Sequence, residues 1–326
     1  MTRPELPNSA EASISVVVPV YRSSEVLPRT VPAMMAQTRE AQWIFVDDGS
    51  GDETSGVLAR LLADTPLAAP GASVQVVCHD RNRGRAATRN TGRAHARGDL
   101  IVFLDADMAP APHFLEAHAV AHQRPGTVGA VSPELWGDLD PRDPYHQYLA
   151  RYRRGWKGLH PDRPVPARLF VIGYTSVRRA ALDEVGGFDE GIPYGEDTDL
   201  AVRLSERFPG GLRYAEGARV VQYGAPTLEA ALSKWRQFGR SSVPLLLERH
   251  PSLARDLGGD LARPDSLRGV VGSILLRASI ARVVRRALPV LPRRLRPPVV
   301  RYLLAEAVVS GYRTSLNRTA ENRVPA

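Results

Sequence analysis

Acidic residues stand in pairs at three places along the chain. The pairs are Asp47 with Asp48, Asp105 with Asp107, and Asp197 with Asp199. The first two come directly after apolar runs that are typical of buried strands. In an open α/β sheet, ligands bind beyond the carboxyl ends of the strands, and carboxylates gathered there repel each other unless a cation or bound donors offset their charge. We therefore expect a metal-bound, highly charged ligand at this edge of the sheet.

The second pair has the spacing of a divalent-metal site. Asp105 and Asp107 are two residues apart, so in an extended segment their side chains point the same way. One carboxylate can then approach a ribose while the other binds a metal ion between two phosphates. Mg²⁺ and Mn²⁺ prefer oxygen ligands and commonly share phosphate with a few carboxylates. We therefore expect Asp105 and Asp107 to hold Mg²⁺ or Mn²⁺.

A glycine-bounded segment, 84–92, predicts an anion site between these pairs. It brings backbone N–H groups to the start of a helix, where anions bind. Arg85 and Arg89 would add charge-assisted bonds to a phosphate. Alternatively, the small residues serve close packing of the helix on the sheet.

The elements that position these residues alternate between strand and helix patterns. We expect strands at 14–18, 43–46, 74–77, 100–104, 128–131, 169–177 and 220–221. We expect helices from Ser23 or Ser24 to Gln37, after a cap at Asp52, and at 84–96, 113–122, 178–185, 196–208 and 228–238. The alternation predicts an α/β fold with a mostly parallel central sheet and helices on both faces. Between Trp136 and Pro166 the pattern dissolves, which indicates an irregular, substrate-specific insert.

Six sequence strings, in order, resemble family 2 glycosyltransferases, which have the Rossmann-like GT-A fold. They are Val16-Val17-Val18-Pro19-Val20-Tyr21, Val46-Asp47-Asp48-Gly49-Ser50, Asn82-Arg83-Gly84 leading to Arg89-Asn90-Thr91-Gly92, Phe103-Leu104-Asp105-Ala106-Asp107, Gly186-Gly187-Phe188-Asp189-Glu190 and Gly195-Glu196-Asp197. The resemblance covers roughly residues 13 to 224. Beyond it, the segments 238–242 and 249–251 are similar to glycosyltransferases that decorate the peptide-derived cofactor mycofactocin. A lipid-linked or natural-product acceptor is an equal alternative.

The resemblance implies a bacterial, inverting hexosyltransferase that uses a UDP-, GDP- or dTDP-sugar. It implies a GT-A domain at 13–250, with a nucleotide-binding half at 13–135 and an acceptor-binding half at 136–250. The implied nucleotide-sugar-binding residues are Pro19, Tyr21, Asp47, Asp48, Arg85, Arg89, Asp105 and Asp107. Asp47 would read the ring N–H of the nucleobase with Asp48 in support, although one of the pair could simply open the turn and cap the next helix.

The resemblance also places catalysis at Glu196 and Asp197. Asp197 is implied as the general base for the acceptor hydroxyl, and the helix dipole at this N-terminus keeps a carboxylate ionised. The alternative is a simple helix cap. Aromatic residues would stack on the sugar or acceptor unless they serve the core; the candidates are Trp136, Tyr145, Trp156 and Tyr174.

The chain departs from the family pattern at two places. Gln222 stands after the late strand where family members often have a histidine, which puts a third protein ligand for the metal in doubt. The Gln-x-x-Arg-Trp string of processive synthases is missing. In its region, Arg236 and Arg240 lie four apart on one helix face and could clamp a diphosphate. We therefore expect transfer of one sugar per encounter.

The net charge of +8 comes almost entirely from arginine, because Lys157 and Lys234 are the only lysines. A GC-rich coding sequence explains this arginine content better than basicity selected for binding nucleic acid. Aromatic residues interleaved for base stacking are not evident, so we expect no nucleic-acid partner. Ten arginines and one acid fall between Arg263 and Arg301, in a helical tail at 251–326. This tail lies either on an anionic membrane surface or packed on the catalytic domain with a solvated arginine face.

Several remaining features predict a cytoplasmic protein, with peripheral contact to the inner face of the cell membrane through the tail. The first residues, 1–12, lack the layout of a signal peptide. Cys78 is the single cysteine and reads as an inert core residue. His118 and His122 have a spacing that suits a metal, but without an acidic partner they read as solvated surface.

Two rival functions stay open. A sugar nucleotidyltransferase would want a glycine- and arginine-rich loop after the first strand, where this chain has 20–24 without one. An arginine-rich adaptor that binds membrane or nucleic acid would show salt-sensitive binding to DNA or anionic vesicles and no binding of sugar nucleotides.

Overall fold

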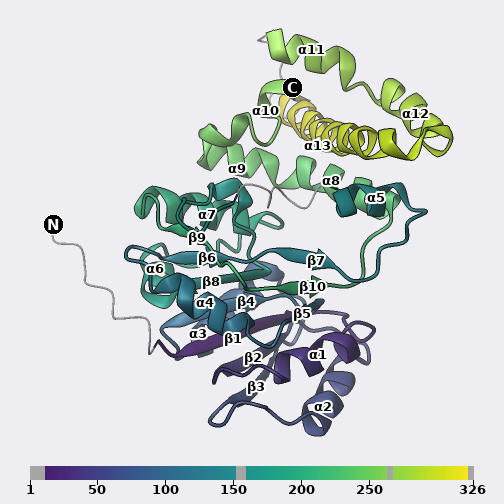
Figure 1. Cartoon of the computed structure of the whole chain (residues 1–326). Helices are drawn as coiled ribbons and strands as arrows, with labels where there is room; N and C mark the ends of the chain where they lie inside the picture. Colours follow the sequence, from purple (N-terminus) through teal and green to yellow (C-terminus); the bar gives the residue numbers. More distant parts are fainter. Residues whose placement is uncertain (1–11, 152–158, 263–266, 322–326) are drawn as a thin grey trace. The chain divides into compact units, whose positions relative to one another are not determined.

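The computed structural model describes residues 12–151, 159–262 and 267–321 (Figure 1). The chain forms two compact units. The first comprises 1–137, 154–191 and 196–224, and the second comprises 138–153, 192–195 and 225–326. The predicted GT-A domain at 13–250 stays a prediction. The division into nucleotide-binding and acceptor-binding halves stays a prediction.

The first unit is built on a seven-stranded sheet in the order β3-β2-β1-β4-β8-β6-β9. Its strands are β1 (Ile14–Val20), β2 (Gln42–Asp47), β3 (Ser73–Cys78), β4 (Leu100–Leu104), β6 (Gly129–Val131), β8 (Tyr174–Arg178) and β9 (Leu212–Tyr214). The strands β3, β2, β1 and β4 run parallel side by side (Figure 1), whereas β8 is antiparallel to both of its neighbours. The expected mostly parallel α/β sheet is confirmed.

A second, three-stranded sheet in the same unit was not foreseen. It has the order β5-β10-β7, formed by β5 (Met108–Pro110), β10 (Val220–Gln222) and β7 (Glu134–Trp136). The antiparallel register of β10 with β5 sets Gln222 opposite Met108. This pairing brings Gln222 next to Asp107, although 115 positions separate them in the chain.

The helices of the first unit largely follow the predicted ranges. They are α1 (Leu27–Met35), α2 (Thr54–Asp64), α3 (Arg85–His95), α4 (Phe114–His122), α6 (Arg179–Glu184) and α7 (Glu196–Arg207). The predicted start of α1 is wrong: neither Ser23 nor Ser24 caps it with a side chain, and the Ser23 carbonyl accepts from the N–H of Leu27 instead. Asp52 accepts from the N–H of Thr54 at 2.9 Å, which orders the turn before α2.

The second unit is helical. It contains α5 (Pro144–Arg151), α8 (Leu228–Ser241), α9 (Val243–Arg249), α10 (Gly259–Ala262), α11 (Leu267–Leu275), α12 (Ala278–Ala287) and α13 (Arg296–Glu321). α13 packs closely on α8 because each helix offers a glycine: a Cβ at Gly239 would lie 3.0 Å from Val308 Cα, and one at Gly311 would lie 2.9 Å from Arg240 N. The helical tail is confirmed, and α5 shows that the segment from Trp136 to Pro166 is not irregular throughout.

Two predictions about single side chains are wrong. Cys78 is exposed, because β3 is an edge strand of the sheet. His118 and His122 are almost fully buried, and both bond to Ser176 Oγ, at 2.8 and 2.9 Å. Burial lowers the pKa of each imidazole to about 3, and the Arg178 charge adds to this effect at His122. Both rings are therefore neutral parts of the core.

Candidate functional site

The carboxyl ends of β1, β2 and β4 meet at one edge of the sheet because these strands are parallel neighbours. This edge carries the acidic pairs that follow β2 and β4. Pro19 pairs with Val46 within the sheet and is half-buried, and Tyr21 is 42% exposed just beyond the strand. The strands that carry these predicted site residues therefore end at one edge of the sheet, as expected.

Asp47 is buried, and its carboxylate holds the turn that follows β2. One oxygen accepts from Ser50 N at 3.0 Å and from Ser50 Oγ at 2.6 Å, and the other accepts from Ser55 Oγ in the first turn of α2. These are the contacts of a residue that opens the turn and supports the next helix. Recognition of a nucleobase by Asp47 stays a prediction.

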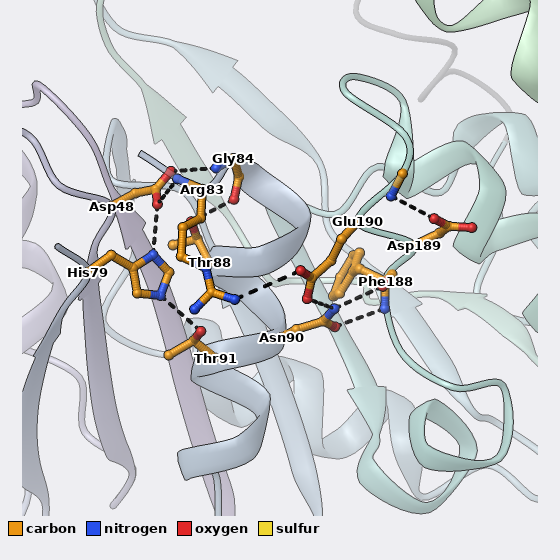
Figure 2. Close-up of polar contacts among 11 residues, drawn as sticks. Asp48, His79, Arg83, Gly84, Thr88, Asn90, Thr91, Phe188, Asp189 and Glu190 are labelled. Carbon is orange, nitrogen blue, oxygen red and sulfur yellow. Dashed lines mark hydrogen bonds and ion pairs between the residues drawn. The ribbon is translucent and has the colours of Figure 1, made fainter. Parts of the chain in front are cut away.

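Asp48 organises the loop before α3 (Figure 2). Its carboxylate accepts from the N–H groups of Arg83 and Gly84, at 2.8 and 2.9 Å, and bonds to His79 Nδ1 at 2.7 Å. A carboxylate only accepts, so Nδ1 carries a proton, and the Nε2 of a neutral ring accepts from Thr91 Oγ1 at 2.9 Å. His79 was not foreseen as a site residue. The sequence signal that could have identified it is its position directly after strand β3.

Asn90 on α3 fixes the glycine-containing loop at 186–191 (Figure 2). Its Nδ2 donates to the Phe188 carbonyl and to Glu190 at 2.8 and 2.9 Å, while its Oδ1 accepts from Phe188 N at 3.0 Å. α3 itself lies close to the sheet because a Cβ at Gly92 would collide with the side chain of Val17. Residues that carried the family resemblance therefore lock two loops onto α3.

Arg89 is buried and bridges two acidic motifs. Its guanidinium donates to Asp105 Oδ1 at 2.9 Å and to Glu196 Oε1. Burial lowers the pKa of Arg89, but the charges of Asp105, Glu196 and Asp197 outweigh this effect, so the net shift is upward and the group stays charged. With its side chain 5% exposed, the guanidinium faces these carboxylates. Phosphate binding by Arg89 stays a prediction.

Asp105 and Asp107 take different surroundings at the end of β4. The Asp105 side chain is 36% exposed and rests against Gly173, where a Cβ would lie 2.8 Å from the carboxyl carbon. Asp107 Oδ2 accepts from Gln222 Nε2 at 2.8 Å. The buried Gln222 Oε1 accepts no hydrogen bond within the described residues. Gln222 thus contacts the acidic pair through its amide.

The oxygen donors at this place fit a divalent metal. Within the described residues, no group of three or more His, Cys, Asp or Glu side chains is arranged to hold a metal ion. Mg²⁺ in nucleotide sites is usually held by one or two carboxylates together with substrate phosphates. Asp105 and Asp107 are two carboxylates of this kind, and the Gln222 amide oxygen is a third oxygen of the same hard character.

Asp197 and Glu196 open α7 with different exposure. Glu196 is 3% exposed and forms the ion pair with Arg89. Asp197 is half-buried and accepts from Thr198 N at 2.8 Å. Asp199, two residues further on, is buried in an ion pair with Arg203 at 2.6 Å. Arg203 also donates to the Gly187 carbonyl at 2.8 Å, which ties α7 to the glycine loop. Among the three acids, Asp197 is the most exposed.

The other predicted site residues lie in varied places. Arg85 is exposed at the first position of α3. Arg236 and Arg240 are exposed on α8 of the second unit, where Arg236 pairs with the buried Glu306 at 3.6 Å.

Among the aromatic candidates, Tyr174 is 1% exposed and belongs to the core. Tyr145 is buried in the second unit, Trp136 is half-buried, and Trp156 lies outside the described residues.

Two solved structures show a fold similar to that of this chain. S. aureus TarS in complex with UDP aligns with a TM-score of 0.52 at 18% identity, over 96% of this chain and 93% of that one. A mannosyltransferase, PcManGT from Pyrobaculum calidifontis in complex with GDP-Man and Mn²⁺, aligns with a TM-score of 0.54 at 21% identity, over 93% and 88%. These likenesses confirm the GT-A fold.

Sequence comparison identifies the family. A pre-mycofactocin glycosyltransferase of Mycobacterium tuberculosis is 31% identical over 241 residues, which make up 73% of this chain and 48% of the relative. The chain thus spans about half the length of this curated relative. The model of glycosyl transferase family 2 matches residues 15–186, the part that carries the strand-end carboxylates and α3. The chain therefore belongs to glycosyl transferase family 2.

Proposed function

We propose that the protein transfers one sugar from a UDP-, GDP- or dTDP-sugar to an acceptor hydroxyl, with inversion at the anomeric carbon. The observation that carries this proposal is the buried bridge through Arg89. It joins Asp105, at the end of β4, to Glu196, directly before Asp197. A group that binds the donor and a base that activates the acceptor must keep a fixed separation, because rates fall steeply with misplacement. The bridge supplies that fixed separation.

Asp197 is the proposed general base. It accepts the proton of the acceptor hydroxyl, whose oxygen then forms a bond to the anomeric carbon. The bond from this carbon to the diphosphate oxygen breaks, and its electron pair leaves with the nucleotide. Asp197 suits this role because it is half-buried at a helix N-terminus, where the dipole favours the carboxylate. General base catalysis supplies about 10²- to 10⁴-fold in rate.

Asp105 and Asp107 are the proposed ligands of Mg²⁺ or Mn²⁺, which would neutralise the charge that develops on the leaving diphosphate. Gln222 supports this set by holding Asp107 in one orientation. Arg85, exposed at the first turn of α3, is the proposed partner of a phosphate. Asp47, Asp48, Pro19 and Tyr21 form the proposed side of the site for the nucleoside.

The acceptor is proposed from the named relative. Similarity to a pre-mycofactocin glycosyltransferase favours a peptide-derived acceptor, and a lipid-linked hydroxyl is the alternative. We propose transfer of one sugar per encounter in the cytoplasm. The missing Gln-x-x-Arg-Trp string supports the single transfer.

The test of this function is release of free nucleotide from UDP-, GDP- and dTDP-sugars in the presence of Mn²⁺ and candidate peptide or lipid acceptors. The wild-type protein should release one nucleotide in step with glycosylated product. Asp197→Asn should bind the same donor and lose transfer, while Asp183→Asn, at an exposed acid paired with Arg93, should keep it. Full turnover by Asp197→Asn would remove Asp197 as the base.

A further inference from the structure

One helix of the second unit exposes its large apolar side chains and buries its small ones. The buried residues of α11 are Gly269 and Gly272. Its exposed apolar residues are Leu267, Val270, Val271, Ile274 and Leu275, with exposed fractions from 43% to 80%. At 3.6 residues per turn, or about 100° per residue, the two sets fall on opposite sides of the helix. This is the reverse of an ordinary surface helix, which turns its apolar face to the core.

The contact between α11 and α10 explains why the two glycines of α11 face inward. A Cβ at Gly272 would lie 2.5 Å from the Leu261 carbonyl oxygen and 3.1 Å from Leu261 Cα. Only glycine allows this approach, so α11 is docked through its backbone. Its leucine, valine and isoleucine side chains are left on the outer side, where they form a contiguous apolar face.

The next helix also exposes apolar side chains and adds positive charge. On α12, Ile280 and Val283 are 37% and 66% exposed, and Val290 just beyond is 83% exposed. The exposed arginines of the segment 267–294 are Arg268, Arg277, Arg282, Arg285, Arg286, Arg293 and Arg294. Arg268 pairs with Asp260 and Arg285 with Glu229, whereas Arg282, Arg286 and Arg293 have no acidic partner within the described residues.

We propose that this surface, formed by the exposed apolar and arginine side chains of 267–294, docks on an anionic phospholipid membrane. Apolar side chains gain by entering the interface between headgroups and acyl chains, and surrounding arginines gain from the negative surface potential. A merely solvated arginine face does not account for the apolar side of α11. Nucleic acid is the poorer partner, because neither α11 nor α12 contains an aromatic residue on which a base could stack.

Sedimentation of the full chain with lipid vesicles tests this proposal independently of sugar transfer. The protein should sediment with vesicles that contain phosphatidylglycerol, far less with phosphatidylcholine alone, and less as salt rises. Ile274→Ser with Leu275→Ser should weaken binding at least about tenfold through lost apolar burial. Arg282→Gln with Arg286→Gln should weaken it by about 25-fold, or about fivefold per arginine.

Matched controls separate this surface from general effects of charge and hydrophobicity. Val120→Ser, at a half-exposed valine of α4, and Arg60→Gln, at an exposed arginine of α2, should bind vesicles like the wild type. Circular dichroism should show an unchanged fold in every variant, because all of these side chains are exposed. Absence of binding to anionic vesicles would overturn the proposal. So would binding to DNA alone, or vesicle binding that stays unchanged in the Ile274→Ser/Leu275→Ser variant.

Discussion

Arg89 and Glu196 form an ion pair in which both side chains are almost fully buried, at 5% and 4% exposure. The pair joins α3 to the first residue of α7, although 107 positions separate the two residues. The other terminal nitrogen of the same guanidinium, Nη2, donates to Asp105. One arginine therefore sets the relative position of the acidic motif at β4 and the acidic motif that contains Asp197.

Replacing Arg89 should cost far more stability than replacing an exposed arginine of the same helix. Arg89→Ala leaves Glu196 buried without its partner, a change that typically costs about 3–5 kcal/mol. Arg93 on α3 pairs with Asp183 at 2.6 Å, but both side chains are partly exposed. Arg93→Ala should therefore cost about 0–1 kcal/mol. Urea denaturation of the two variants measures the difference.

A second substitution checks the cause of that loss. Adding Glu196→Gln to Arg89→Ala removes the uncompensated charge, so the double variant should recover part of the stability. A double variant less stable than Arg89→Ala would contradict the role of the buried charge pair.

Gly173→Ala should disturb the Asp105 carboxylate without unfolding the protein. The new Cβ would lie 2.8 Å from the Asp105 carboxyl carbon, so this side chain must move. We expect at least about tenfold weaker metal-dependent donor binding, because a small misplacement of a binding group is costly. Gly56→Ala on α2 is the control, since a Cβ there meets nothing within 4 Å. Equal donor binding by the two variants would contradict the placement of Asp105 at the donor.

Gln222→Ala should weaken Mn²⁺ binding in the presence of nucleotide by about 10- to 100-fold, the usual effect of losing a group that orients a metal ligand. The physical reason is the lost hydrogen bond from Gln222 Nε2 to Asp107. Calorimetric titration of Mn²⁺ into protein saturated with nucleotide measures the effect. Gln222→His is a second variant to measure, because tighter Mn²⁺ binding than in the wild type would mean that histidine adds a ligand here. Unchanged Mn²⁺ affinity in Gln222→Ala would remove Gln222 from the site.

Acid should destabilise the protein through His118 and His122. Their folded-state pKa of about 3 lies below the ordinary value of 6.5, so between these two values the unfolded chain binds protons that the folded chain does not. Stability is therefore full above about pH 6.5 and falls as the pH drops towards 3, by up to about 1.4 kcal/mol per pH unit for each imidazole.

Urea midpoints across this pH range measure the fall. Exchange of an exposed histidine, His160→Gln, should leave the pH dependence unchanged. A stability that is flat between pH 6 and pH 4 would contradict neutral burial of the pair.

The central strands and the acidic strand ends were predictable because their signals are local. Residues 43–46 and 100–104 are continuous apolar runs, and 14–18 is interrupted only by Ser15, as expected for strands covered on both faces. The motif order then placed Asp47 and Asp105 at one edge of a parallel sheet. Membership of family 2 added the position of Asp197 as a candidate base.

The features that were missed depend on contacts between distant segments. The burial of His118 by Ser176 requires β8 to lie under α4, and the exposure of Cys78 follows from the place of β3 at the sheet edge. The contact of Gln222 with Asp107 depends on the pairing of two short strands. The bridge through Arg89 likewise needs α7 beside α3. None of these relationships has a signature within one segment of sequence.

Calorimetric titration of UDP, GDP and dTDP, each with and without Mn²⁺, is the sharpest test of a metal-assisted donor site at the end of β4. We expect that one of these nucleotides binds, that binding requires the metal, and that Asp107→Ala abolishes it. Arg97→Ala, at an exposed arginine beyond the end of α3, should bind like the wild type. Binding of none of the three nucleotides, or metal-independent binding that survives Asp107→Ala, would contradict a metal-assisted sugar transferase with its donor at the end of β4.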